Sequence, residues 1–190
     1  MRLFLALELP PEVKQAAAGV TAQLKQAGAD IKWVASQNLH LTLKFLGEVA
    51  QELLPRLKQA LSETLAGREA LDLTVRGCGA FPSLKSPQVV WLGLAGHAAA
   101  LAGLAADLEA ACEPLGFARE QRGFQAHLTL GRLRRGRGPA RSNQALARVL
   151  ASLAGYEGPD FRGRRVALMH STLTTQGPIY QPLAVWELAS

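Results

Sequence analysis

The tetrapeptide His-Leu-Thr-Leu occurs twice in this chain, at residues 40–43 and 127–130. On a β-strand, alternate residues point to the same side, so each copy places a histidine and a threonine on one face and two leucines on the other. Both copies therefore predict a strand with a buried leucine face and a polar face. A core role for histidine gives no reason for threonine to recur at the same offset, so the repetition favours a shared functional site.

The composition is that of a folded protein with a preference for acidic partners. Of the 190 residues, 48% are hydrophobic, which is enough to bury a core and argues against a disordered chain. The 21 lysines and arginines outnumber the 15 aspartates and glutamates, giving a formal net charge of +6. Such a surplus favours phosphates, nucleic acids or membrane headgroups as partners, and it does not choose among them.

Neither the cysteines nor the N-terminus indicates export or a metal site. Cys78 and Cys112 lie far apart, with no cysteine or histidine at metal-ligand spacing beside them, so we expect no disulfide, no zinc site and a reducing cytoplasm. The first apolar run stops at Pro10 and is typical of a strand rather than a leader. The apolar stretch at residues 95–115 is interrupted by charged residues, so no membrane-spanning segment is predicted.

Strands and helices are predicted from residue types and spacing. Two helices and about four strands precede residue 95, and the remainder has a similar layout. Helical patterns cover residues 11–26, 51–65, 98–115 and 143–153. Segments rich in leucine, valine, threonine or aromatic residues predict strands at residues 2–9, 31–34, 39–46, 71–78, 89–94, 127–133, 165–174 and 182–188.

The duplicated layout parallels the duplicated motif. Interleaved strands and helices could also form a parallel, doubly wound sheet. However, no glycine-rich phosphate loop follows the first strand, and several strands adjoin with no helix between them. These features argue against a parallel sheet and favour a structural repeat.

Two strands that carry this motif could bring His40, Thr42, His127 and Thr129 to one site. An imidazole has an ordinary pKa of about 6.5, so near neutral pH one ring can accept a proton while the other donates one. A 2',3'-cyclic phosphodiester suits such a pair. One group deprotonates the attacking water, the other protonates the departing ribose oxygen, and hydroxyls hold the phosphate oxygens. None of these steps needs a metal ion or a cofactor.

A metal site and a structural role are the alternatives for the histidines. Two histidines and two threonines lack the carboxylates that hard divalent cations prefer, so a metal site ranks below proton transfer. For His97 and His170, which stand outside the motif, we predict structural roles.

Two H-x-T-x motifs about half a chain apart resemble those of the two-histidine phosphoesterase superfamily. Within it, the chain is similar to the RNA 2',3'-cyclic phosphodiesterases, historically named 2'-5' RNA ligases. The resemblance covers nearly the whole chain. It extends to the segments MRLFLALELP, NLHLTLKFLGEV, VVWLGL, HLTLGR and STLTTQGPIYQPL.

The resemblance implies an α+β fold in which residues 1–190 form a single domain of two pseudo-symmetric lobes. Each lobe is an antiparallel sheet backed by helices, with the active site in a central cleft. It also implies that His40 protonates the leaving 3' oxygen and that His127 activates water, leaving a 2'-phosphate. The reverse reaction would join RNA ends through a 2'-5' linkage.

Two further residues are predicted to bind substrate. Arg132 matches a family arginine that contacts the phosphate. Its odd offset from His127 would turn it away on a regular strand, so Gly131 would have to permit a bulge or a strand end. Phe45 has the same offset from His40, and it either packs in the core or reaches the cleft and stacks on a base. Tyr180, in the closing segment, is interpreted as a buried structural residue.

The leading prediction is a monomeric, metal-independent and cofactor-free phosphodiesterase acting on RNA ends that bear a 2',3'-cyclic phosphate. One alternative is a relative that acts on small cyclic phosphates or on 2',5'-linked oligonucleotides. Another is an RNA-binding module with vestigial activity, built on the arginine-rich run at residues 132–141. The glycines and proline of that run are typical of an exposed loop.

Overall fold

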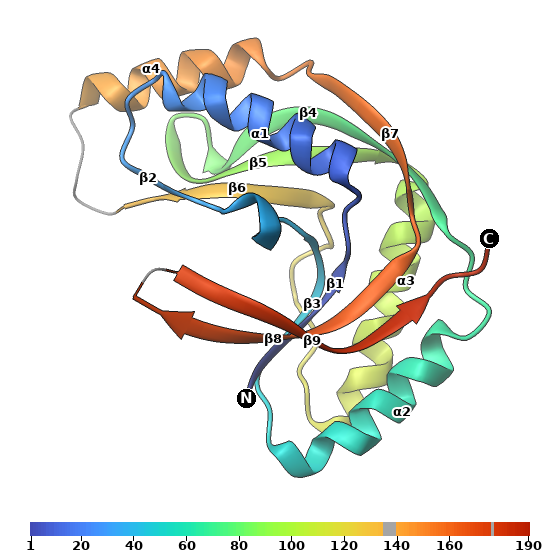
Figure 1. Cartoon of the computed structure of the whole chain (residues 1–190). Coiled ribbons are helices and arrows are strands. Elements are labelled where there is room, and N and C mark those ends of the chain that lie inside the picture. The colour runs from blue at the N-terminus through green and yellow to red at the C-terminus, as the bar shows by residue number, and fades with distance from the viewer. Residues whose placement is uncertain (135–139, 176) are drawn as a thin grey trace.

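The computed structural model describes residues 1–134, 140–175 and 177–190 (Figure 1). Its α-helices are α1 (Pro11–Lys25), α2 (Leu54–Leu65), α3 (Ala98–Cys112) and α4 (Ala140–Ser152), and short 3-10 turns lie at η1 (Ser36–Asn38), η2 (Gln51–Leu53) and η3 (Glu113–Leu115). Its strands are β1 (Arg2–Leu7), β2 (Ile31–Trp33), β3 (Leu41–Glu48), β4 (Leu71–Ser83), β5 (Ser86–Gly96), β6 (His127–Leu133), β7 (Glu157–Gly163), β8 (Arg165–Thr174) and β9 (Gly177–Glu187).

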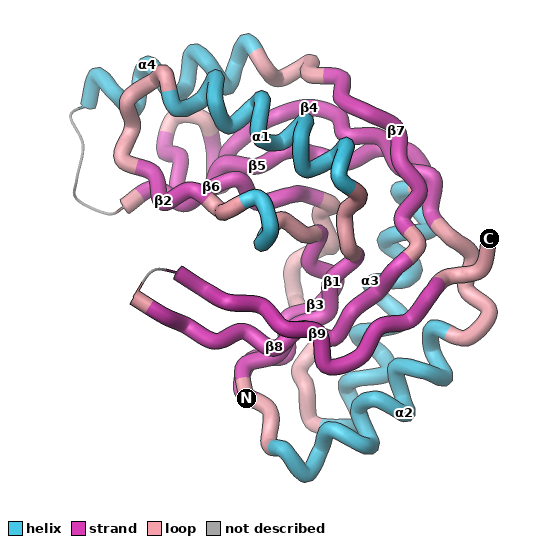
Figure 2. Tube along the Cα trace, viewed as in Figure 1, coloured by secondary structure: helices cyan, strands magenta, loops and turns pink. Residues whose placement is uncertain are grey.

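The named strands pair in antiparallel fashion in one curled sheet, which Figure 2 traces. The strand order is β7-β4-β5-β6-β3-β1-β8-β9, and β2 pairs with the second half of β6. Among the described residues, the motif strands β3 and β6 meet at one residue pair, Leu41 opposite Leu128. This narrow contact divides the sheet into a first lobe (β3, β1, β8, β9) and a second lobe (β6, β5, β4, β7). The predicted α+β fold of two lobes is confirmed.

Two helices pack against the lobe opposite to that of the strand before them. Helix α1 follows β1 of the first lobe but contacts α4 and β7 of the second, while α3 follows β5 of the second lobe and contacts α2 and β3 of the first. Each lobe also combines strands from both halves of the chain. The sequential repeat expected from the layout is therefore interleaved in space rather than divided into an N-terminal and a C-terminal lobe.

Alternating leucines fix the position of the motif strands. Leu41 is 1% exposed and Leu128 is 0% exposed, and both belong to a single core cluster that runs through the two lobes. Full burial of a leucine side chain stabilises a fold by about 1.5–3 kcal/mol. Because a shift of one residue would expose these leucines, the register that turns the polar residues outward is strongly specified.

Strand β7 is the one strand in the described residues that the sequence patterns did not predict. Its sequence, EGPDFRG, contains glycine, proline and aspartate, which are all depleted in strands. However, β7 lies at the edge of the sheet and pairs only with β4 in the strand order, and proline is tolerated on edge strands. The hairpin strands β4, β5 and β9 are also longer than predicted.

The arginine-rich run at residues 132–141 falls partly outside the described residues. Arg132 and Leu133 close β6, and residues 140 and 141 begin α4, so both ends of the run are regular structure rather than loop. The part predicted as loop at residues 135–139 is not described. No helix in the described ranges is long and apolar enough to span a membrane.

Both thiols are expected to be unreactive in the folded protein. Cys78 and Cys112 are free and buried, and burial raises the pKa of Cys78 to about 12 and that of Cys112 to about 11. Since the thiolate is the nucleophile, iodoacetamide should label both residues at least about a hundredfold more slowly in the native protein than in urea. Mass spectrometry of timed samples measures this ratio. Equal labelling rates in the native and the unfolded protein would show that the two thiols are not buried.

Candidate active site

The repeated motif brings its four polar side chains to one face of the sheet. Leu41 and Leu128 lie opposite each other and point into the core. Thr42, His127 and Thr129 therefore point to the opposite side. His40 lies just before β3, which begins at Leu41 rather than at the predicted residue 39, and its ring packs on Phe4, the partner of Phe45 on the same side. We call this side the motif face. Thr42 is exposed there, and His40, His127 and Thr129 are partly buried.

Each histidine ring forms the same hydrogen bond, to the backbone carbonyl two residues before it. Nδ1 of His40 lies 2.7 Å from the carbonyl oxygen of Asn38, and Nδ1 of His127 lies 2.7 Å from that of Gln125. A carbonyl can only accept, so Nδ1 carries the proton and donates it in both rings. Nε2 is then the nitrogen left for proton transfer. The two copies of the motif thus present equivalent acid–base groups.

Aromatic rings restrain both histidines from the side. The His40 ring lies 4.7 Å from Phe4 and 5.3 Å from Tyr180, which it meets edge to face, and Phe4 contacts Tyr180 at 5.0 Å. The His127 ring meets Phe81 edge to face at 5.0 Å. These contacts limit ring rotation, which preorganises Nε2 for catalysis.

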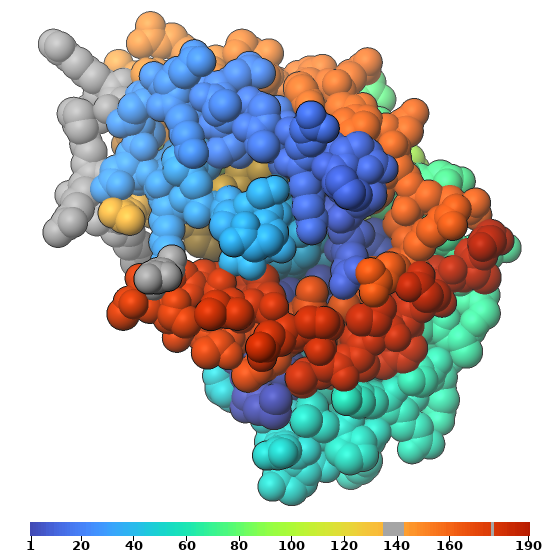
Figure 3. Space-filling view, viewed as in Figure 1, coloured from blue at the N-terminus to red at the C-terminus, as the bar shows by residue number. Residues whose placement is uncertain are grey.

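Tyr180, which the sequence indicated as a buried structural residue, is half-buried and contacts His40. It is partly exposed and belongs to the β8–β9 hairpin, which Figure 3 shows in red against the light-blue segment that contains η1. The side-chain amide of Asn38 donates to the carbonyl of Pro178 at 2.8 Å and ties the hairpin to the segment that carries His40. The packing of Tyr180 against His40 could not be predicted from the sequence, because Phe4, His40 and Tyr180 come from three distant segments.

Burial sets the protonation of His40. It lowers the pKa of His40 below the ordinary value of 6.5; the hydrogen bond to the Asn38 carbonyl opposes this, and the positive charge of Lys14 on α1 adds to it. A lowered pKa favours the neutral ring. A reaction that needs protonated His40 should therefore decline as the pH rises through a value below 6.5 in the free enzyme.

Replacing Lys14 with methionine should move this decline to higher pH. The substitution removes a positive charge that disfavours the imidazolium, so the pKa of His40 rises and the protonated form persists further into the alkaline range. The alkaline limb of kcat/KM against pH for a cyclic phosphodiester measures the shift. Lys25→Met, which makes the same charge change at the far end of α1, should leave the limb unmoved. If the alkaline limb lay at the same pH in the wild type, Lys14→Met and Lys25→Met, the charge of Lys14 would have no effect on the pKa of His40.

A β-bulge turns Arg132 to the motif face. Thr129 lies opposite Trp91 and Gly131 opposite Val90, so Leu130 is an extra residue in β6. The bulge reverses the alternation and returns Arg132 to the side of Thr129, as the odd offset required. A Cβ on Gly131 would lie 2.5 Å from the Ile31 side chain, which explains glycine at this position.

The charge of Arg132 acts on Tyr180 in the first lobe. Burial raises the pKa of Tyr180, while the charges of Arg132 and Arg2 lower it. Arg132 from the second lobe therefore acts on a ring that also contacts His40. Arg132 is exposed, and a guanidinium is a group that binds phosphates.

A second bulge turns Phe45 to the same face. Thr42 lies opposite Ala6 and Lys44 opposite Leu5, so Leu43 is an extra residue in β3, and Phe45 lies opposite Phe4. The Phe45 side chain is 53% exposed, and the Arg2 guanidinium lies 5.0 Å from its ring centre. Core packing, one of the two interpretations left open by the sequence, is therefore wrong.

The remaining histidines lie away from the motif face. His97 immediately precedes α3, and its Nδ1 accepts a hydrogen bond from the Asp72 amide at 3.3 Å. His170 on β8 pairs with Leu3, which points into the core. The structure thus gathers His40, Thr42, His127, Thr129, Arg132 and Phe45 and leaves His97 and His170 aside. Within the described ranges, no group of three or more His, Cys, Asp or Glu residues is arranged to hold a metal ion.

Paired imidazoles, hydroxyls and an arginine form a site suited to proton transfer around a phosphate. The sequence profile of the LigT like Phosphoesterase family matches the chain twice, at residues 7–91 and 92–180. The chain belongs to this family. The two matched segments each contain one copy of the motif.

Individual relatives align with this chain over nearly its full length. The RNA 2',3'-cyclic phosphodiesterase of Methanothermobacter thermautotrophicus is 35% identical over 188 residues, covering 99% of both chains. That of Thermus thermophilus is 37% identical, covering 99% of this chain and 90% of its own. Among solved structures, Escherichia coli LigT complexed with 3'-AMP has a TM-score of 0.77 at 27% identity, covering 100% of this chain and 98% of its own.

Proposed function

We propose that this protein hydrolyses RNA 2',3'-cyclic phosphate ends to 2'-phosphates with His40 and His127 as general acid and base. The observation that carries the proposal is the pair of motif histidines on one face, each with Nδ1 bound to a carbonyl and Nε2 left for proton transfer. The relatives named as RNA 2',3'-cyclic phosphodiesterases support the substrate class.

In the proposed reaction, neutral His127 accepts a proton at Nε2 from a water molecule, whose oxygen attacks phosphorus. The bond from phosphorus to the 3' oxygen breaks, and protonated His40 donates the proton of Nε2 to that oxygen. A 2'-phosphate remains, His127 is protonated and His40 neutral, and exchange with solvent restores both. The resemblance to the family assigns the acid to His40 and the base to His127.

The remaining residues would act on the phosphate. Thr42 and Thr129 flank the two histidines on the motif face and can donate hydroxyl hydrogens to the equatorial oxygens. Arg132 would offset the charge that shifts onto these oxygens. The bound anion would also favour protonated His40 and oppose the effect of burial on its pKa. Phe45 would provide an exposed ring on which a base can stack.

The site is complete within one chain, so we propose a monomeric enzyme. Its buried free thiols suit a reducing cytoplasm, and the proton transfers described require neither metal ion nor cofactor. If a ribose 5'-hydroxyl attacked phosphorus in place of water, the same breakage of the bond to the 3' oxygen would join RNA ends through a 2'-5' linkage.

Substrate comparison tests the proposal. Matched oligonucleotides that end in a 2',3'-cyclic phosphate or contain one 2',5' linkage would be incubated with the protein, together with a 2',3'-cyclic mononucleotide, and the products separated by chromatography. We expect the cyclic RNA end to be opened fastest. Faster turnover of the 2',5'-linked oligonucleotide, or RNA binding with no turnover of any substrate, would contradict the proposal and favour one of the two alternative functions.

A further inference from the structure

The two motif strands differ in what lies along their edges. Strand β2 pairs with the second half of β6 and places Lys32 opposite Arg132. Strand β3 meets β6 at Leu41 alone, and no described strand continues along that edge of β3. The loop at residues 116–126 lines a pocket beside Lys44 and Phe45 instead. Phe45 and Arg132 occupy equivalent positions in the two copies of the motif. A strand lies beside Arg132, whereas a loop lies beside Phe45, so the two halves of the site differ here.

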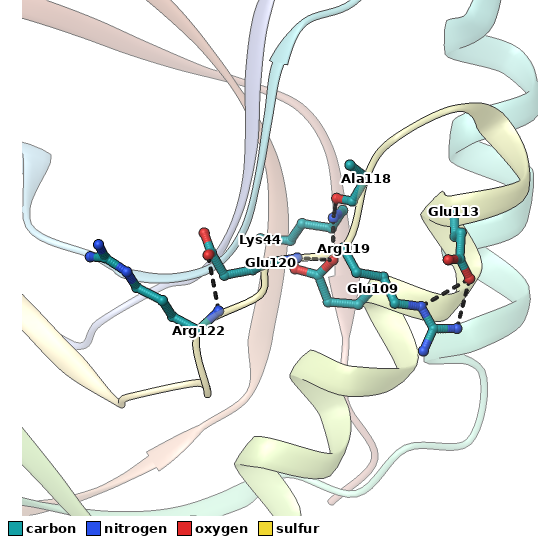
Figure 4. A network of polar contacts seen from close by, with 7 residues as sticks. All are labelled: Lys44, Glu109, Glu113, Ala118, Arg119, Glu120 and Arg122. Carbon is teal, nitrogen blue, oxygen red and sulfur yellow. Dashed lines mark hydrogen bonds and ion pairs between the residues drawn. The ribbon is translucent and has the colours of Figure 1, made fainter.

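A buried ion pair fixes this loop against β3. The Lys44 side chain is 1% exposed, and its Nζ donates to the Glu109 carboxylate on α3 and to the Ala118 carbonyl at 3.0 Å (Figure 4). The same carboxylate lies 3.3 Å from the Glu120 amide, which donates to it. Removing one partner alone would leave a buried charge unpaired and would destabilise the protein.

The space between Phe45 and residues 118–122 forms a pocket of about 380 Å³, which we call the β3 edge pocket. This volume is within the range of small-ligand sites. Phe45, which is exposed, is one of the residues that line the pocket. Phe45 is the one predicted site residue in the lining, three residues along β3 from Thr42, and the pocket is open to solvent.

Two charged groups around the pocket, the Arg122 guanidinium and the Glu120 carboxylate, form no ion pair with any described residue. Lys44 neutralises Glu109, and Arg119 pairs with Glu113 at 2.8 Å. The Glu120 carboxylate accepts a hydrogen bond from the Arg122 amide at 3.2 Å. An exposed aromatic ring with a nearby arginine is the combination that binds single-stranded nucleic acid.

We propose that the β3 edge pocket binds the nucleotide that precedes the cyclic terminal nucleotide of RNA. Its base would enter beside Phe45, and its phosphate would bind Arg122. The inference rests on the proposed function and adds to it a subsite for RNA beyond the terminal nucleotide. The Lys44–Glu109 pair would keep the outer wall of the subsite in place before RNA arrives, which reduces the entropy lost on binding.

The test compares a dinucleotide ending in a 2',3'-cyclic phosphate with the 2',3'-cyclic mononucleotide. Wild-type protein should have the higher kcat/KM for the dinucleotide. Arg122→Ala should reduce this preference about tenfold, because a charge-assisted hydrogen bond contributes on that order, and should change the mononucleotide rate less than about twofold. Arg134→Ala, which removes an exposed arginine on the β6 side, is the matched control and should keep the preference.

The outcomes separate this inference from the proposed function. If wild-type protein hydrolyses the mononucleotide and shows no preference for the dinucleotide, the subsite is wrong and the proposed function stands. If Arg134→Ala loses the preference and Arg122→Ala keeps it, the RNA lies along the second lobe, which also overturns the inference. Hydrolysis of neither substrate would overturn both.

A double variant tests the contribution of the ion pair. Lys44→Met with Glu109→Leu replaces both charges by apolar groups of similar size, a change that proteins often tolerate without loss of stability. We expect the melting temperature to be retained and KM for the dinucleotide to rise, with the mononucleotide KM little changed. An unchanged dinucleotide KM would show that the loop needs no ion pair to form the subsite.

Discussion

Replacing either motif histidine with alanine should lower kcat by about 10²- to 10⁴-fold, the range that general acid–base catalysis contributes. Each imidazole supplies one of the two proton transfers, and alanine supplies none. The fold should survive, because both rings are partly exposed on the motif face and their neighbours Leu41 and Leu128 carry the core packing. Initial rates with a 2',3'-cyclic nucleotide, together with circular dichroism of each variant, provide the measurement.

The control for this prediction is His97→Ala. His97 lies before α3 and away from the motif face, so its loss should leave kcat unchanged. The wild-type pH profile should be bell-shaped, and each motif variant should lose one limb from any residual activity. A His40 or His127 variant with the wild-type rate would remove that residue from the mechanism.

Replacing Arg132 with alanine should lower kcat/KM by about 10²- to 10³-fold, as loss of a group that stabilises transition-state charge typically does. The bulge at Leu130 turns Arg132 to the motif face, and its charge reaches Tyr180 beside His40. We therefore expect the guanidinium to bind the phosphate. Steady-state kinetics would separate the loss in kcat from the change in KM.

Arg134→Ala is the matched control for Arg132→Ala. Arg134 is exposed two residues further on, and its guanidinium lies 3.8 Å from Asp30. Both substitutions remove one positive charge, so a general electrostatic effect would reduce kcat/KM equally in the two variants. We expect a large loss only for Arg132. Equal losses, or an unchanged rate for Arg132→Ala, would show that its guanidinium does not contact the phosphate.

The motif strands could be predicted from sequence because leucine burial specifies their register. Strand β6 begins and ends where predicted, and the polar residues of both motifs share one face. Strand β3 was predicted at residues 39–46 and covers Leu41–Glu48, so its first two predicted residues lie outside the strand. Two bulges complete the site. The bulge at Leu130, just before Gly131, was expected from the odd offset of Arg132. The bulge at Leu43, which exposes Phe45, has no glycine beside it and could not be predicted in the same way.

Other parts of the site depend on pairings between distant segments. Tyr180 reaches His40 only because β1 lies between β3 and β8, and β9 pairs with β8. The interleaving of the lobes is likewise set by packing of α1 and α3 across the lobes rather than by local propensity. Lys44 could not be found either, because the bulge at Leu43 directs it away from the motif face and into contact with α3.

Phosphorus NMR of an oligonucleotide with a 2',3'-cyclic phosphate end, incubated in EDTA with wild-type protein and with His40→Ala, tests the central claim most directly. We predict that the cyclic signal is replaced by a 2'-phosphate signal with the wild type and persists with the variant. A cyclic phosphate that survives wild-type protein, or that opens equally fast with the variant, would contradict acid–base catalysis by the two motif histidines.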